Sequence, residues 1–397
     1  MAQFEEQLDA AMAALRGQMR SSGRSVRAVA KWSNNQRCAT NNAMFVARVD
    51  DDRLLQRTSL APEFGQSPFA LARGARVEQI GRANQYAVTV SLLREHFGYG
   101  IPEVVALDLR HGFQPNNIGM AQRARATERA LQAAIRDERD APNIIDGAVL
   151  RAQIGGFLAH LEADGVGAKT GPVFHVNEYK GWPVVDGRAH DAAKLGATVA
   201  QMGIYRYLLA DTIDRLGGDP DTVAGTGLLI TPRNVGLTLV GNPIRLAGAT
   251  RLAEHTLANL PHPRDFIGSL PEGLDFGAVA RGDHEGSRLD ALERITNRLG
   301  TRYQESCMGN CGLAKFCRAR ARASGSTSLV GESVARFMPG VVSLPRAAAL
   351  ADGATPAEGE VVTGAASVLA AAGRLYREKL SGGSLPPIAA VGGGRAS

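Results

Sequence analysis

One segment of the sequence combines a carboxylate and a lysine at a spacing that suits phosphodiester hydrolysis. Glu178 and Lys180 lie in the alternating segment VFHVNEYK at 173–180, and residues two apart in a strand project from the same face. A carboxylate is a hard oxygen ligand for a divalent metal that activates water. An ammonium beside it can orient the water or offset charge in the transition state. The spacing therefore predicts a hydrolytic site at the end of this strand.

The lysine of this pair is unusual for this chain. Only six of the 45 Lys and Arg residues are lysines, and no other Glu-x-Lys or Asp-x-Lys occurs in the sequence. An alternative interpretation is an ion pair at an exposed strand end, which would contribute about 0.5 kcal/mol.

Two carboxylates upstream are candidates for the same site. The segment 157–164 is predicted to be a strand with Glu162 and Asp164 on one face, and Glu78 lies in a predicted helix at 67–97. Each also has a structural interpretation, because Asp-Gly suits a hairpin turn and a helical Glu can simply be solvated.

Downstream, Gln201 and Tyr205 lie four residues apart in a predicted helix at 189–215. They therefore share one helix face, although such a pair also occurs as ordinary surface and core residues.

This order of motifs resembles the PD-(D/E)XK nuclease superfamily and, within it, the RecB-like branch. The resemblance spans about 67–215 and implies a restriction-endonuclease-like fold, a mixed central sheet flanked by helices, with a Mg²⁺ or Mn²⁺ site. Carried over residue by residue, the resemblance makes Glu78, Asp164 and Glu178 metal ligands and Lys180 the residue that assists the attacking water. It matches Gln201 and Tyr205 to the Gln-x-x-x-Tyr motif of the helix that follows the Glu-x-Lys strand. Many relatives have Gly where this chain has Leu161, so Glu162 is an alternative to Asp164.

The four cysteines form a second chemical pattern. Cys307, Cys311 and Cys317 lie within eleven residues, and Cys38 is alone near the start of the chain. An iron–sulfur cluster accepts three close thiolates and a distant one. A zinc site and buried free thiols are the alternatives, although the spacing lacks the Cys-x-x-Cys pairs that zinc favours.

The cysteine order also resembles a subset of RecB-like nucleases, which includes CRISPR-adaptation nucleases and AddB-type subunits. In that subset one cysteine before the nuclease core and three after it hold a 4Fe-4S cluster. The resemblance implies that Cys38, Cys307, Cys311 and Cys317 do so here, joining the N- and C-terminal segments. Closing a loop of about 270 residues would remove on the order of 5 kcal/mol of unfolded-chain entropy.

Hydrophobic periodicity and turn residues predict the elements that position these side chains. Helices are expected at 3–20, 67–97, 119–139, 189–215 and 364–379. Strands are expected at 44–49, 104–109, 144–150, 157–164, 173–180, 225–234 and 236–246, the last two joined by a turn near Asn234. The helix at 67–97 has Ser67 as its expected cap, and 381–397 is expected to be disordered.

Composition narrows the class of protein. The 397 residues are 44% hydrophobic and 21% charged with a net charge of +6, and no apolar run is long enough to span a membrane. Four cysteines are too sparse for a disulfide-stapled secreted fold, so we expect a cytoplasmic protein. Arginines at 123–136 and 318–322 could contact nucleic-acid phosphates or form ordinary solvated helix faces.

These observations lead to one predicted organisation and function. The segments are an N-terminal arm at 1–66, a nuclease core at 67–260, a cluster-binding segment at 261–322 and an Ala/Gly-rich tail at 323–397. The resemblance implies a deoxyribonuclease that acts as an exonuclease or trims single-stranded or frayed DNA ends, in repair, recombination or defence. The alternative is a non-catalytic module of this fold that binds DNA or a helicase, and a zinc-stapled scaffold is a third hypothesis.

Overall fold

The computed structural model is a mixed α/β protein in which the chain forms two compact units. One contains Met1–Arg302 and Gly309–Leu313, and the other contains Tyr303–Met308 and Ala314–Ser397. The structure describes residues 2–380 except 20, 23–25, 63–67, 102, 115–116, 155–156, 170–172, 186–187, 190–191, 235 and 261–262. The expected cap Ser67 and the expected disordered end 381–397 lie outside these residues.

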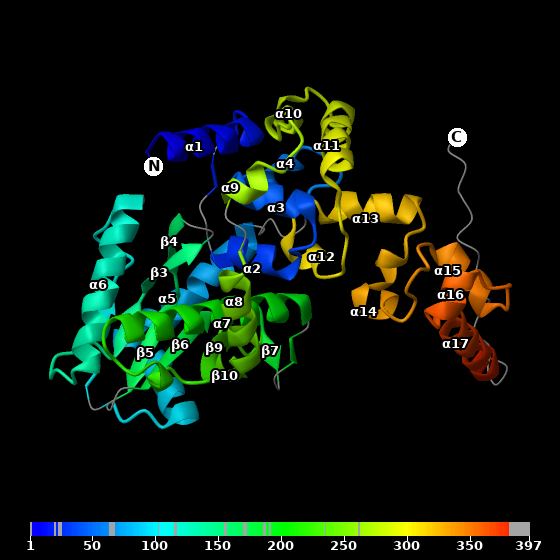
Figure 1. Ribbon diagram of the computed structural model, residues 1–397. Helices are drawn as coiled ribbons and strands as arrows, with labels where there is room; N and C mark the ends of the chain where they lie inside the picture. Colours follow the sequence, from blue (N-terminus) through cyan, green and yellow to red (C-terminus); the bar gives the residue numbers. More distant parts are fainter. Residues whose placement is uncertain are drawn as a thin grey trace. The chain divides into compact units, whose positions relative to one another are not determined.

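A six-stranded sheet organises the first unit (Figure 1), and its spatial order is β1-β2-β5-β6-β9-β10. The strands are β1 (Ala106–Asp108), β2 (Ile144–Asp146), β5 (Gly165–Lys169), β6 (Val173–Tyr179), β9 (Thr226–Pro232) and β10 (Leu239–Arg245). Strands β2, β5 and β6 run antiparallel in succession, and β9 then lies parallel to β6. The hairpin of β9 and β10 is antiparallel, as predicted, and a hydrogen bond from the Gly236 amide to Asn234 Oδ1 lies in its turn.

Two short strand pairs lie outside this sheet. β3 (Val149–Ile154) and β4 (Phe157–Glu162) form a hairpin, and β7 (Val184–Val185) pairs with β8 (Arg188–Ala189). The strand predicted at 157–164 therefore ends at Glu162, and Asp164 lies in the bend that leads into β5.

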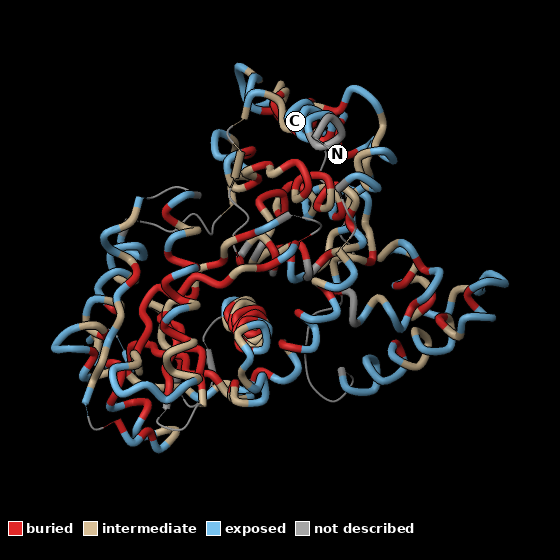
Figure 2. Tube along the Cα trace, turned by 60° about the vertical axis from the view of Figure 1, so that its left-hand side comes forward, coloured by how far each residue is buried: buried red, intermediate tan, exposed pale blue. Residues whose placement is uncertain are grey.

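Helices pack on both faces of the sheet because β6 alternates between two apolar clusters. Phe174 and Val176 pack in a cluster that includes Leu208 of α7 (Ala192–Arg215). Tyr179 packs in another with Val77 of α5 (Pro68–Phe97). Strands β2, β6 and β9 are almost entirely buried, and Figure 2 shows the buried stretches gathered in the interior, with exposed stretches outside them.

The helix predicted at 67–97 forms, but it is interrupted. Ala83 is extended, and Asn84, Gln85 and Tyr86 have left-handed backbone angles, with φ between 52° and 60°. Such angles are strained for residues other than glycine. The break lets the buried Tyr86 donate a hydrogen bond from its hydroxyl to Asp146 Oδ2, 3.0 Å away. The helical pattern of the sequence therefore did not predict the break, which coincides with this side-chain hydrogen bond.

The prediction of a strand at 44–49 is wrong, because residues 44–46 end helix α3 (Ala39–Val46) and 47–49 follow it without strand structure. Thr40, Ala43 and Met44 are buried at helical spacing rather than in alternation. Packing against other helices decides the secondary structure of a short apolar run when its periodicity fits both a helix and a strand.

The remaining helices of the first unit surround this core. They are α1 (Ala2–Arg16), α2 (Val26–Asn34), α4 (Asp51–Leu54), α6 (Asn117–Ile135), η1 (Pro220–Thr222), α8 (Ala247–Ala258), α9 (Pro263–Ile267), α10 (Gly277–Arg281) and α11 (Glu285–Leu299). Helix α6 was predicted to be exposed, but Ala124, Thr127 and Leu131 on one face are fully buried.

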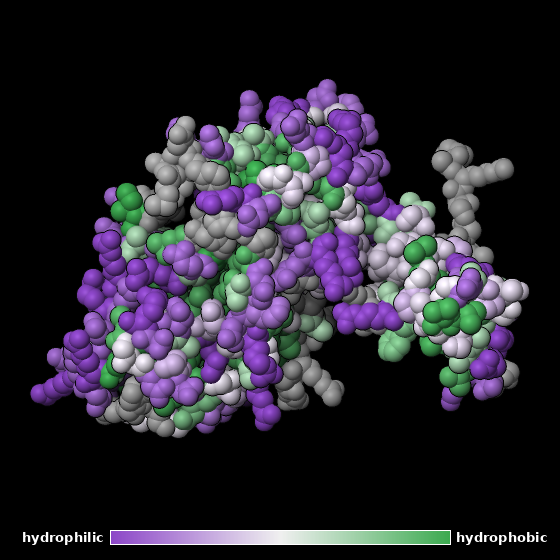
Figure 3. Space-filling view, viewed as in Figure 1, coloured by the Kyte–Doolittle hydropathy of each residue, from purple (hydrophilic) through white to green (hydrophobic). Residues whose placement is uncertain are grey.

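The second unit is helical. It contains α13 (Ala314–Ala323), η2 (Thr327–Val330), α14 (Glu332–Ala335), α15 (Leu344–Ala351), α16 (Glu358–Val362) and the predicted α17 (Ala365–Leu380), and the short α12 (Cys307–Asn310) begins in it. Met338, Val341 and Leu350 form a small apolar core. Apolar side chains also lie on its surface (Figure 3), including Val362, which is 80% exposed.

No helix in the described part of the chain is both long enough and apolar enough to span a membrane.

Close approach between α5 and β6 depends on a glycine, which gives a testable prediction. A Cβ built on Gly81 would lie 2.4 Å from Tyr179 Cε1, whereas one on Gly74 in the same helix meets nothing within 4 Å. We expect Gly81→Ala to lower the free energy of unfolding by about 1–3 kcal/mol through overpacking. Gly74→Ala, the matched control, should be neutral or stabilising by up to about 1 kcal/mol. Urea unfolding of both variants measures this, and equal effects would contradict it.

Candidate active site

The end of β6 brings the predicted carboxylate and lysine together. Glu178 is fully buried and faces α7, and its Oε1 atom accepts a hydrogen bond from the Lys180 ammonium. The same oxygen accepts a hydrogen bond from Gln201 Nε2 at 3.0 Å. The other oxygen, Oε2, is buried without a hydrogen-bond partner among the described residues. Oε1 of Glu178 thus accepts two hydrogen bonds, whereas Oε2 accepts none from the described residues.

Gln201 and Tyr205 connect this carboxylate to the β3–β4 hairpin. Gln201 Nε2 also donates to the Tyr205 hydroxyl at 3.1 Å, and that hydroxyl donates to the backbone carbonyl of Glu162. The expectation that the two residues share a helix face is confirmed. They act as a rigid link between α7 and the two strands that carry the acids.

Asp164, rather than Glu162, lies beside Glu178. Asp164 Oδ2 accepts the backbone N–H of Tyr179 at 3.0 Å, which fixes its carboxylate at the end of β6. Glu162 instead pairs with Arg123, whose Nη1 lies 2.9 Å from Glu162 Oε2. Of the two alternatives left open by the sequence, the geometry favours Asp164 as the partner of Glu178.

Burial and charge shift the pKa values of the central pair. Burial, with the nearby Asp164 carboxylate, raises the pKa of Glu178 to about 8, although Lys180 opposes the shift. Burial tends to lower the pKa of Lys180, but the charges of Glu178, Asp164 and Glu78 outweigh it and raise that pKa. Lys180 therefore stays an ammonium, and its neighbours include all three predicted carboxylates.

Glu78 is oriented toward arginines. Its Oε2 atom lies 2.8 Å from Arg82 Nη2 and 3.9 Å from Arg110 Nη1. Within the described residues, no three His, Cys, Asp or Glu side chains are arranged to hold a metal ion. The sequence-predicted set of Glu78, Asp164 and Glu178 is thus gathered in one region, but it is not a preformed three-carboxylate site.

Sequence reasoning missed the residues that surround this set. Asp146, at the end of β2, is 2% exposed. Its Oδ2 atom lies 2.6 Å from Arg82 Nε, and its Oδ1 atom lies 2.9 Å from Arg110 Nε. Arg110 follows β1. Arg110 directly follows the strand predicted at 104–109, but Asp146 lies within the strand predicted at 144–150. The pairing of β1 with β2 that brings the two residues together follows from the tertiary structure.

The donor set fits a hard divalent cation in part. Asp164 and Glu178 supply carboxylate oxygens side by side, and the unpartnered Glu178 Oε2 is a buried oxygen of the kind that Mg²⁺ or Mn²⁺ binds. Glu78 would have to leave Arg82 to join them.

The four cysteines form no disulfide with one another. Cys38 and Cys311 belong to the first unit, and Cys307 and Cys317 to the second. Cys38 and Cys307 are buried.

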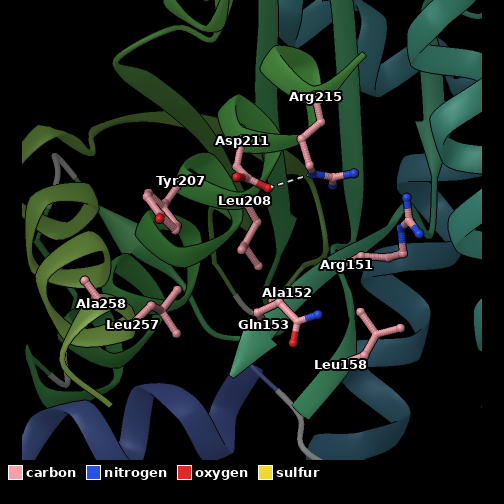
Figure 4. Close-up of a pocket in the computed structure, with 10 residues that line it drawn as sticks. All are labelled: Arg151, Ala152, Gln153, Leu158, Tyr207, Leu208, Asp211, Arg215, Leu257 and Ala258. Carbon is pink, nitrogen blue, oxygen red and sulfur yellow. Dashed lines mark hydrogen bonds and ion pairs between the residues drawn. The ribbon is translucent and has the colours of Figure 1, made fainter. Parts of the chain in front are cut away.

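A cleft of about 460 Å³ lies among β3, β4, α7 and α8 (Figure 4). Arg151 and Arg215 line it, but both pair with Glu128, and Arg215 also pairs with Asp211. None of the predicted catalytic residues lines it. Its positive charge is compensated, so we assign it no role.

The raised pKa of Glu178 predicts how the stability of metal-free protein depends on pH. The folded protein favours the protonated form of a carboxyl group whose pKa rises on folding. The group therefore makes its full contribution to the free energy of unfolding below pH 4.5, and this contribution is lost as the pH rises toward 8. Glu178→Gln removes this loss. We expect the variant to exceed the parent in free energy of unfolding by on the order of 2–4 kcal/mol at pH 8, and by much less at pH 5. Thermal unfolding in EDTA at both pH values tests this, and a constant difference would contradict it.

Comparisons with known proteins identify no family. No protein-family model and no curated protein matches the chain. A solved structure described as "Crystal structure of SSO0001" is 14% identical with a TM-score of 0.21, and the match covers 66% of this chain and 88% of that chain. A TM-score of that size does not establish a common fold.

Proposed function

We propose that this protein is a Mg²⁺- or Mn²⁺-dependent deoxyribonuclease of the PD-(D/E)XK type. The observation that carries the proposal is the buried Glu178, which contacts Lys180 and Gln201 and lies beside Asp164. Glu178 and Lys180 lie at the end of the Glu-x-Lys strand, Asp164 lies in the bend before β5, and Gln201 lies on the following helix. This is the order along the chain that the resemblance implies. An ordinary surface ion pair would not bury its carboxylate completely.

The order of the sheet is a second support for this proposal. Three antiparallel strands, β2, β5 and β6, are followed by α7 and then by β9 parallel to β6. A mixed sheet with helices on both faces is what the resemblance implies. The proposed catalytic residues lie at the start of β5, at the end of β6 and on α7.

Each side chain has a distinct role in this proposal. Asp164 and Glu178 would hold the divalent ion, with Glu78 as a further ligand. A bound ion would supply Lewis-acid activation of the phosphate and of the attacking water. The Lys180 ammonium would orient that water and offset charge on the phosphate. Gln201 keeps Glu178 in position, and Tyr205 anchors Gln201 to the backbone of β4.

The overall reaction is hydrolysis. The water oxygen forms a bond to phosphorus, the bond from phosphorus to a sugar oxygen breaks, and that oxygen takes a proton. On the basis of the resemblance, we propose single-stranded or frayed DNA ends as substrate. We expect no sequence specificity, because nothing in the sequence suggests base-specific contacts.

Three variants test catalysis. Lys180→Ala and Asp164→Asn should each reduce Mn²⁺-dependent degradation of labelled single-stranded DNA at least about 100-fold. The first removes the positive charge beside the phosphate, and the second removes a proposed metal ligand. Glu162→Gln should retain most activity, since the Glu162 carboxylate is paired with Arg123 and Arg110 and is not a proposed metal ligand. Lys379→Ala, at an exposed lysine of α17, is the matched control.

Unchanged cleavage by Lys180→Ala would overturn the proposed catalytic site. Loss of activity in Glu162→Gln, with activity retained in Asp164→Asn, would make Glu162 the metal ligand in place of Asp164. Specific DNA binding without cleavage by the parent protein would favour the non-catalytic binding module.

We also propose a 4Fe-4S cluster on Cys38, Cys307, Cys311 and Cys317, on the strength of their order in the sequence. The protein purified without oxygen should be brown, with broad visible absorbance from thiolate-to-iron charge transfer. Cys311→Ser should lose the colour and the bound iron. A colourless protein with stoichiometric zinc would replace the cluster with a zinc site.

A further inference from the structure

Arg110 is shared among four carboxylates around the proposed site. Its Nε atom lies 2.9 Å from Asp146 Oδ1, and its Nη2 atom lies 3.3 Å from Asp164 Oδ1. Its Nη1 atom lies 3.2 Å from Glu162 Oε1 and 3.9 Å from Glu78 Oε2. The side chain is only 20% exposed, so these contacts are made in a partly desolvated region where charge interactions are strong.

Both oxygens of Asp164 are engaged in this arrangement. Oδ2 accepts the Tyr179 backbone N–H, and Oδ1 faces Arg110. A divalent ion that binds both Asp164 and Glu178 must take the place of the guanidinium at Oδ1 or share that oxygen with it. Glu178 Oε2 requires no such exchange, because it has no hydrogen-bond partner among the described residues.

Arg110 can yield this contact without leaving the site. Its bond to the buried Asp146 is made through Nε, a different nitrogen from the one that faces Asp164. Asp146 is also held by Tyr86 and Arg82, so the anchor does not depend on Asp164.

We propose that Arg110 is an internal counter-ion that competes with the divalent metal for Asp164 and thereby sets the metal concentration at which the site is filled. The inference rests on the proposed function, since it requires Asp164 to be a metal ligand. Without Arg110, Glu78 and Asp146 keep Arg82 and Glu162 keeps Arg123, but no other arginine in the described part of the chain pairs with Asp164. The site then attracts a divalent cation more strongly.

The test measures Mn²⁺ binding to the full chain by calorimetry in the absence of DNA. Arg110→Gln should bind Mn²⁺ roughly tenfold more tightly than the parent, from the loss of one positive charge beside the ligand. Its thermal midpoint should also rise more on Mn²⁺ addition, since a tighter ligand stabilises the fold more. Arg123→Gln is the matched control, because Arg123 contacts Glu162 and the Gly147 carbonyl but not Asp164. Its affinity should change less than threefold.

A second variant covers the case in which Arg110→Gln does not fold. Arg110→Lys keeps the charge but loses the planar guanidinium that spans four carboxylates, and its Mn²⁺ affinity should lie above that of the parent. Equal or weaker Mn²⁺ binding in the folded variants would overturn the inference.

Asp164→Asn separates this inference from the proposed function. Loss of Mn²⁺ binding in Asp164→Asn, with unchanged binding in Arg110→Gln, would keep the metal site and reject the competition. Absence of Mn²⁺ binding in every protein, the parent included, would overturn the metal site and the competition with it.

Discussion

A carboxylate buried completely at the end of a strand is the feature on which the rest of this site depends. An ionised Glu178 without compensation would be very costly in the interior. Lys180, Gln201 and the raised pKa of the group are three forms of that compensation. None of them engages Oε2, so the compensation is incomplete on one side.

Apolar packing on both faces of β6 makes the burial of Glu178 possible. Strand β6 presents Phe174 and Val176 to the cluster that includes α7, and Tyr179 to the cluster that includes α5. Gly81 permits α5 to approach Tyr179 closely. Packing on both faces leaves the strand end little freedom, and the polar groups at that end take their positions from it. Acids and arginines then alternate around this end, with Asp146 as the buried anchor of Arg82 and Arg110.

Predictions from sequence succeeded where local pattern and tertiary packing agree. The alternation at 173–180 and the apolar spacing at 189–215 correspond to β6 and α7, and both carry their predicted polar residues on the expected faces. They failed where packing overrides pattern. The apolar run at 44–49 begins inside a helix that packs against other helices, and none of it is a strand. Helix α5 breaks at Ala83–Tyr86, where the Tyr86 hydroxyl contacts Asp146. Arg110 carries no local signal of its contacts.

The sequence alone determined that Glu178 and Lys180 share a face and that Gln201 and Tyr205 share another, because strand and helix periods are local properties. It also determined the order of the four cysteines. Only the tertiary structure decided that Asp164 lies beside Glu178 while Glu162 pairs with Arg123. It alone also decided that Arg110 and Asp146 join the acids. These contacts link β1, β2, the start of β5 and the end of β6, and strand neighbours of this kind follow from packing of the whole chain, which no local period encodes.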